Sequence, residues 1–293
     1  MFSGSLVALV TPMRADGALD FEAWSRLIDW HLANGTAGIV VGGTTGESAT
    51  LGETELRELA SRACAQVARR ISVIAGAGTS STAATAERVH RLSELPLDAI
   101  LVVTPAYNRP TQEGLYRHYA AAAEATRVPL IPYNVPARTA VDLLPETVAR
   151  LAQLSPIVAV KEAVARIERI RELRERCREG FAILSGDDAT AREAVLAGAS
   201  GVISVTANVA PRAMADLMAS AARGERERAA QLDTPLNALH QALFLETSPI
   251  PVKWALARMG LIERGIRLPL TELSERHHAA LTSALREAGA LGA

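Results

Sequence analysis

Apolar residues recur along the chain in eight short runs, each five or six residues long and rich in Val, Ile, Leu and Ala. A short run with little polar interruption is typical of a strand that is buried on both faces. The pattern therefore predicts eight buried strands, at residues 5–10, 37–41, 71–75, 99–103, 129–133, 157–161, 181–185 and 201–205.

Amphipathic segments separate these runs, and their apolar residues recur at spacings of three and four, the period of an α-helix. The predicted helices include residues 21–34, 53–69, 83–95, 112–126, 145–154 and 166–178. Because strands and helices alternate, we expect a parallel sheet that is covered by helices. Eight such units predict closure into a (β/α)8 TIM barrel, with an open doubly wound sheet as the alternative.

The strand pattern stops near Gly224, and three helical stretches follow it at residues 225–245, 250–260 and 271–288. We therefore expect a C-terminal three-helix extension after the barrel. The chain is accordingly divided into a (β/α)8 barrel domain at residues 1–224, which would carry the active site, and a helical domain at residues 225–293.

Composition narrows the partners that the protein is expected to have. The chain has 293 residues, of which 49% are hydrophobic, and a net charge of −1, so it can build a large core but has no basic surface for nucleic acid or a membrane. It shows neither a secretion signal nor an apolar segment of membrane-spanning length. We expect a cytoplasmic protein whose partners are small molecules.

Lysine is rare in this chain, which makes each lysine informative. Of 31 basic residues only Lys161 and Lys253 are lysines, so arginine fills almost every position where a positive charge is sufficient. A neutral lysine amine can attack a carbonyl group, whereas guanidinium stays protonated. Lys161 ends the run at residues 157–161, where burial would lower its pKa, while Lys253 lies where a helix is expected to begin. The alternative is that Lys161 is a structural lysine at a strand end.

The other chemically active side chains follow the carboxyl ends of the predicted strands, where a parallel barrel builds its active site. Taken singly, each has an ordinary interpretation as a turn, a loop contact or a surface charge. Together they place hydroxyls, phenols, a guanidinium and an amine at one barrel mouth. The candidates beside Lys161 are Thr44, Thr45, Tyr107, Tyr133 and Arg138.

This set of groups suits one type of reaction, in which an amine condenses with a 2-oxo acid and the resulting enamine attacks an aldehyde. The phenols would move the protons. No metal or other cofactor is required, because the iminium group accepts the electrons, and the histidines lack metal-site spacing. The acidic pair Asp187-Asp188 is predicted to cap the following helix rather than to bind a metal ion.

Six motifs resemble the pyruvate-dependent class I aldolases and lyases of the dihydrodipicolinate synthase / N-acetylneuraminate lyase family. The resemblance spans essentially the whole chain. The motifs are Gly43-Thr44-Thr45-Gly46-Glu47-Ser48, Thr104-Pro105 with Tyr107-Asn108-Arg109-Pro110, Tyr133-Asn134-Val135-Pro136-Ala137-Arg138-Thr139, Lys161-Glu162-Ala163, Ser185-Gly186-Asp187-Asp188 and Gly201-Val202-Ile203-Ser204-Val205.

The resemblance implies a role for each candidate residue. Lys161 would form a Schiff base with pyruvate, Tyr133 would be the general acid/base, and Thr44 and Tyr107 would complete the proton relay. Thr45 would hold the carboxylate of pyruvate and Arg138 that of the aldehyde, while Gly186 and Ile203 would line the pocket through their backbone. In the family the tyrosine at position 107 reaches a neighbouring subunit's site, which implies a homotetramer built as a dimer of dimers.

Two places in the chain, the first loop and the position after Tyr133-Asn134-Val135-Pro136-Ala137, resemble the synthase branch of the family. The Thr44-Thr45 pair and Arg138 suit an aldehyde that carries its own carboxylate, L-aspartate 4-semialdehyde. That branch condenses the aldehyde with pyruvate to give 4-hydroxy-tetrahydrodipicolinate, the first committed step toward diaminopimelate and lysine. The alternatives are a related aldolase or lyase acting on another aldehyde acid or sugar acid, and a non-catalytic 2-oxo acid sensor.

Departures from the family pattern affect positions outside the catalytic set. Ser248 stands where asparagine is frequent, and Ala106 replaces an aromatic residue before Tyr107. In lysine-inhibited members the effector binds two histidines, an Asn, a Glu and a Tyr, for which this chain has Glu53, Leu56, Ser80, Ala84 and Ala106. The resemblance therefore implies that free L-lysine inhibits this protein weakly or not at all.

Overall fold

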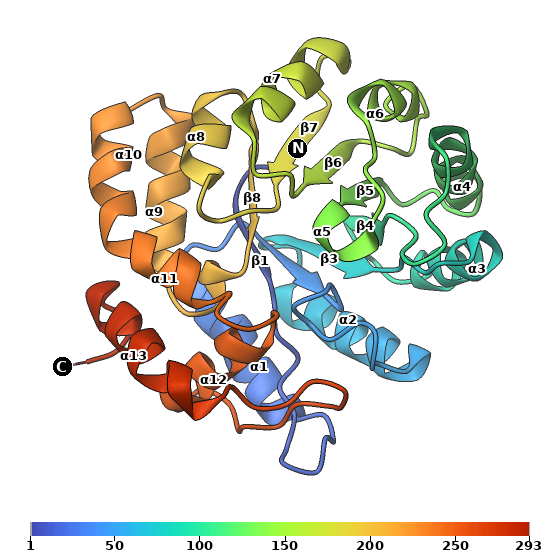
Figure 1. Ribbon diagram of the computed structural model, residues 1–293. Helices are drawn as coiled ribbons and strands as arrows, with labels where there is room; N and C mark the ends of the chain where they lie inside the picture. Colours follow the sequence, from blue (N-terminus) through green and yellow to red (C-terminus); the bar gives the residue numbers. More distant parts are fainter. Residues whose placement is uncertain (1, 293) are drawn as a thin grey trace.

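Eight parallel strands close into a barrel in a computed structural model that describes residues 2–292 (Figure 1). Each strand pairs with its neighbour in sequence, and β1 pairs with β8. The strands are β1 (Gly4–Ala8), β2 (Gly38–Val41), β3 (Ser72–Gly76), β4 (Ala99–Val103), β5 (Leu130–Asn134), β6 (Ala159–Glu162), β7 (Ala182–Ser185) and β8 (Gly201–Ser204). The predicted (β/α)8 barrel is confirmed, and the open doubly wound sheet is excluded.

Successive residues of each strand point to opposite faces of the barrel wall, so the strands are buried on both sides. One cluster, which includes Leu6, Val40, Ile74 and Ile131, fills the barrel interior. The larger cluster packs the outer face of the strands against the helices. This double burial explains why the strands show nearly continuous apolar runs.

Helices surround the barrel and cover its outer face (Figure 1). The structure bears out all six predicted helices, with ends that differ by a few residues. The surrounding helices are α1 (Phe21–Ala33), α2 (Glu53–Val67), α3 (Thr82–Leu92), α4 (Gln112–Glu124), α6 (Pro145–Leu151), α7 (Ile167–Arg176), α8 (Ala191–Leu196) and α9 (Pro211–Ala222), and the short α5 (Pro136–Thr139) follows β5 directly.

The C-terminal helices lie to one side of the barrel, drawn in orange and red in Figure 1. They are α10 (Arg226–Asp233), α11 (Asn237–Ala242), α12 (Ile250–Arg258) and α13 (His278–Glu287). The first predicted stretch is divided by a 3-10 turn at Thr234–Leu236, because Pro235 has no N–H for a regular helix.

The extension is continuous with the packing of the barrel helices, since α10 contacts both α8 and α9. The division at residue 224 into two domains therefore stays a prediction, and its outer ends, Met1 and Ala293, lie outside the described residues. None of the helices between residues 2 and 292 combines the length and hydropathy that crossing a lipid bilayer requires.

Candidate active site

A cavity of about 720 Å³ opens at the carboxyl ends of the strands. Its wall comes from the ends of β5 and β6, from the segments that follow β2, β5, β6, β7 and β8, and from the segment before α12. Six of the eight candidate residues line it, which are Thr44, Thr45, Tyr133, Arg138, Lys161 and Gly186. Segments far apart in the sequence are thus brought to one site, as the barrel topology predicts.

Lys161 projects into the barrel from the end of β6. Tyr133 of β5 lies beside it in register, and the Lys161 Nζ is 4.2 Å from the centre of the Tyr133 ring. Burial lowers the pKa of Lys161 to about 7; Asp188 opposes this shift and Arg138 adds to it. A substantial fraction of the amine is therefore neutral, and nucleophilic, near neutral pH.

Tyr133 is buried in the same wall and keeps its proton at neutral pH. Burial raises the pKa of Tyr133 to about 12, although Arg138 and the hydroxyl of Thr44 each lower it. The phenol can therefore donate a proton to a leaving or developing oxygen beside Lys161.

The loop after β2 holds Thr44 and Thr45 in a compact turn. The N–H groups of Gly46 and Glu47 donate to the carbonyl oxygens of Gly43 and Thr44, at 3.0 and 3.1 Å. The Thr11 hydroxyl donates to the Gly46 carbonyl at 2.7 Å from the neighbouring strand end. The turn is thus fixed to the barrel, with both threonines on the cavity wall.

Arg138 crosses the mouth from α5 toward the C-terminal extension. Its guanidinium donates to the Thr247 hydroxyl and to the Ser248 carbonyl, both at 3.4 Å. Ser248 also lies close to the first loop, because its hydroxyl is 3.5 Å from that of Thr45. These long contacts leave the guanidinium able to accept a carboxylate ligand.

Gly186, after β7, lies against the catalytic candidate itself. A Cβ at this position would be 3.1 Å from the Lys161 Cε and 2.9 Å from the Ala163 Cβ. Only glycine leaves the lysine side chain in its present place.

Two candidates lie outside this cavity wall. Ile203 is buried in the barrel interior, and Val205 contributes to the wall instead. Tyr107 is 95% exposed and has φ +70°, a strained value for a residue with a side chain. Its neighbours are held by Ser80, whose hydroxyl donates to the Ala106 carbonyl and whose carbonyl accepts from the Asn108 amide. The roles of Tyr107 and Ile203 stay predictions.

No role in the site was predicted from the sequence for Glu162, although this residue follows Lys161 directly. Tyr133 and Lys161 face the interior, so the next pair in register, Asn134 and Glu162, faces outward. The Asn134 amide donates to both Glu162 carboxylate oxygens at 3.0 and 3.1 Å, and the Val164 N–H donates at 2.7 Å. Burial nevertheless raises the pKa of Glu162 to about 7. The sequence feature that could have identified Glu162 is an acidic residue at the end of a buried strand, next to Lys161.

The prediction that Asp187-Asp188 caps the following helix holds for Asp187 and is wrong for Asp188. The carboxylate of Asp187 accepts hydrogen bonds from the N–H and the hydroxyl of Thr190, the N-cap residue of α8, at 2.9 and 2.7 Å. Asp188 instead accepts hydrogen bonds from the N–H groups of Val205 and Thr206, at 2.9 and 2.8 Å, and so fixes the turn after β8.

Within residues 2–292 no group of three or more His, Cys, Asp or Glu side chains is arranged to hold a metal ion.

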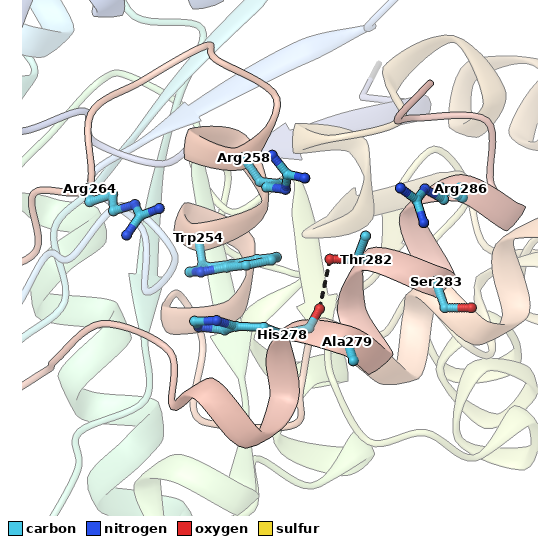
Figure 2. Close-up of a pocket in the computed structure, with 8 residues that line it drawn as sticks. All are labelled: Trp254, Arg258, Arg264, His278, Ala279, Thr282, Ser283 and Arg286. Carbon is cyan, nitrogen blue, oxygen red and sulfur yellow. Dashed lines mark hydrogen bonds between the residues drawn. The ribbon is translucent and has the colours of Figure 1, made fainter. Parts of the chain in front are cut away.

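A second cavity, of about 540 Å³, lies in the extension and contains none of the candidate residues (Figure 2). Trp254 of α12 stacks on His278 of α13 there, with ring centres 4.5 Å apart. The stack joins the two helices.

A closed (β/α)8 barrel whose mouth holds a buried, low-pKa lysine against a buried tyrosine defines a class, the barrel enzymes that use a lysine amine. The sequence profile of the dihydrodipicolinate synthetase family matches residues 1–288. The chain belongs to this family.

Its similarity to curated relatives extends over almost the full length. The chain is 54% identical to the 4-hydroxy-tetrahydrodipicolinate synthase of Alkalilimnicola ehrlichii, over 99% of this chain and 100% of the relative. It is 55% identical to the enzyme of that name from Ectopseudomonas mendocina, with the same coverage of both chains.

Solved structures of dihydrodipicolinate synthases have the same fold as this chain. The chloride-inhibited dihydrodipicolinate synthase of Acinetobacter baumannii, solved in complex with pyruvate, is 47% identical and superposes with a TM-score of 0.98 over 99% of this chain and 100% of that one. A monomeric dihydrodipicolinate synthase variant is 44% identical, with a TM-score of 0.96 over 99% and 98% of the two chains.

Proposed function

We propose that Lys161 forms a Schiff base with pyruvate and that the cavity around it carries the condensation with L-aspartate 4-semialdehyde. The chain is an enzyme of the lyase type, and its reaction gives 4-hydroxy-tetrahydrodipicolinate in diaminopimelate and lysine biosynthesis. The observation that carries the proposed mechanism is the buried Lys161 amine, with its pKa lowered to about 7, beside Tyr133.

The neutral Lys161 amine adds to the carbonyl carbon of pyruvate. The carbinolamine oxygen takes a proton and leaves as water, which gives the iminium. The methyl carbon then loses a proton, and the enamine that forms attacks the aldehyde carbon, whose oxygen takes up a proton. Finally the amino group of the aldehyde substrate adds to the iminium carbon and closes the ring, so that Lys161 is released.

Tyr133 is placed to give and take these protons, because its phenol lies beside the Lys161 amine and stays protonated at neutral pH. Thr44 is its neighbour on the cavity wall, and we assign it to the same relay, completed by Tyr107. Thr45 would bind the pyruvate carboxylate, and the backbone of Gly186 and Ile203 would bound the pocket.

Arg138 is proposed to bind the carboxylate of the aldehyde substrate. Its side chain reaches across the mouth, where a guanidinium can form two parallel hydrogen bonds with a carboxylate. The arginine would therefore determine which aldehyde is used.

A homotetramer and a cytoplasmic location complete the proposal. An exposed, strained Tyr107 is understandable if a second subunit covers it and receives its hydroxyl. Sedimentation analysis of the purified protein tests the tetramer.

Steady-state assays with pyruvate and two aldehydes, L-aspartate 4-semialdehyde and an analogue without the carboxylate, test the proposed specificity. We expect the protein to prefer the semialdehyde. The substitution Arg138→Ala should lower kcat/KM for the semialdehyde by a factor equivalent to about 2 to 4 kcal/mol, because a bidentate charged contact is lost. Pyruvate adduct formation should change little. Equal losses in both steps would show that Arg138 is structural.

A further inference from the structure

The second lysine of the chain is also buried, in the extension. Lys253 lies in α12 with 3% of its surface exposed, and its ammonium pairs with Glu47 Oε1. Glu47 is also 3% exposed. Two charges removed from water are costly unless they pair with each other. Loss of either partner of this contact between the extension and the barrel should therefore destabilise the protein strongly.

Glu47 belongs to the turn that presents Thr44 and Thr45. Its φ is +57°, and its N–H closes the turn by donating to the Thr44 carbonyl. A residue held in this strained backbone conformation needs outside contacts to stay there. The side chain of Glu47 supplies them.

The second carboxylate oxygen of Glu47 accepts a hydrogen bond from the Arg267 N–H at 3.1 Å. The Arg267 guanidinium then binds the Thr50 carbonyl at 2.8 Å and both oxygens of Glu55, at 2.6 and 2.8 Å. Lys253 and Arg267, two residues of the extension, therefore hold both ends of the segment that follows Thr45.

The helix that carries Lys253, α12, also packs against α13. The next residue, Trp254, stacks on His278 of α13 (Figure 2). The packing of α12 against α13 therefore fixes the position of Lys253, and the ion pair transmits that position to the turn.

We propose that the Glu47–Lys253 ion pair is a positioning device through which the extension sets the hydroxyls of Thr44 and Thr45 for pyruvate. This inference rests on the proposed roles of the two threonines. Lys253 acts through Glu47 and touches no substrate. An ion pair that served stability alone would leave the kinetic constants for pyruvate unchanged once the charges were removed together.

The test compares the wild type with Lys253→Met and with the double variant Glu47→Gln/Lys253→Met. The single variant leaves Glu47 buried without its ammonium partner, so its Tm should fall sharply. The double variant leaves no lone charge, so its Tm should recover toward the wild-type value. Its kcat/KM for pyruvate should nevertheless remain at least tenfold low, because the turn has lost its tether to α12.

Leu173→Ala is the matched control. Leu173 is fully buried in α7, which is not packed against α12 or α13, so the variant destabilises the protein without touching the ion pair or the helices that hold it. We expect a lower Tm with an unchanged KM for pyruvate. Wild-type kcat/KM in the double variant would overturn the proposal, and so would a rise in the pyruvate KM of Leu173→Ala equal to that of the ion-pair variants.

A conservative variant keeps the test decisive if the double variant does not fold. Lys253→Arg keeps the charge but changes its shape, so kcat/KM for pyruvate should fall less than in Lys253→Met; no difference between the two would overturn the proposal.

Mass analysis after borohydride reduction with saturating pyruvate separates this proposal from the proposed function. The ion-pair variants should still carry the adduct on Lys161, whereas its absence from the wild type would instead contradict the proposed mechanism.

Discussion

At the scale of single residues, burial shifts the pKa of the two side chains to which we assign the chemistry. The barrel interior around Lys161 is apolar, and the cost of placing a charge there lowers the pKa of the amine to about 7. The same burial raises the pKa of Tyr133 to about 12. One environment thus favours a neutral amine beside a protonated phenol, which suits the roles of nucleophile and proton donor that we propose for them.

The pH dependence of adduct formation follows from the lowered pKa of Lys161. The reactive form is the neutral amine, and protonation removes it as the pH falls through about 7. At one pH unit below that value about a tenth of the amine remains neutral. Single-turnover trapping of the pyruvate adduct should therefore show a rate that falls nearly tenfold per pH unit below about pH 6. An unchanged rate down to pH 5.5, or an inflection near the ordinary lysine pKa, would contradict this account.

At the scale of elements, the strand register decides which side chains meet. Tyr133 pairs with Lys161 across β5 and β6, so both point inward, and the next pair stabilises the outer face. Sequence patterns predicted the eight strands, and they placed six of the eight candidate residues on one cavity wall, because buried parallel strands have a simple apolar signature. The patterns did not show that Asp188 binds the turn after β8, because that contact joins two loops whose approach depends on barrel closure. The break at Pro235 was equally missed, since the helical period continues on both sides of it.

Gly186→Ala tests the close packing of β6 against β7. The added methyl group would be 3.1 Å from the Lys161 Cε and 2.9 Å from the Ala163 Cβ, so the lysine must move. We expect a folded protein whose kcat/KM for pyruvate is reduced by one to two orders of magnitude, on the order of 1.4 to 3 kcal/mol. Circular dichroism and steady-state kinetics check the two parts. Unaltered kinetics would show that the position of Lys161 tolerates displacement.

At the scale of the whole molecule, the barrel and the extension build the site together. Ser248 lies against Thr45, Arg138 reaches Thr247 and Ser248, and Lys253 holds Glu47. The sequence indicated where each part lies but not that the extension contributes to the wall of the barrel mouth, because long-range contacts leave no local pattern. Regulation is a second property at this scale.

Free L-lysine is predicted to inhibit this protein weakly or not at all. The chain lacks the histidines and the acidic and phenolic side chains that hold the effector in lysine-inhibited relatives, as the resemblance implies. Glu53, which could attract a cationic ligand, is already paired with Arg88 and Arg91. Steady-state assays with lysine up to tens of millimolar should show little change in rate. Strong inhibition below one millimolar would show that other residues form an effector site.

The central claim is that Lys161 forms a covalent intermediate with pyruvate, and borohydride trapping tests it most directly. The protein is incubated with pyruvate, reduced, and analysed by intact mass and peptide mapping. We expect one pyruvate-derived adduct per chain, located on Lys161, and none in Lys161→Arg, because guanidinium cannot condense. An adduct on Lys253, or an active protein that shows no adduct, would contradict the account.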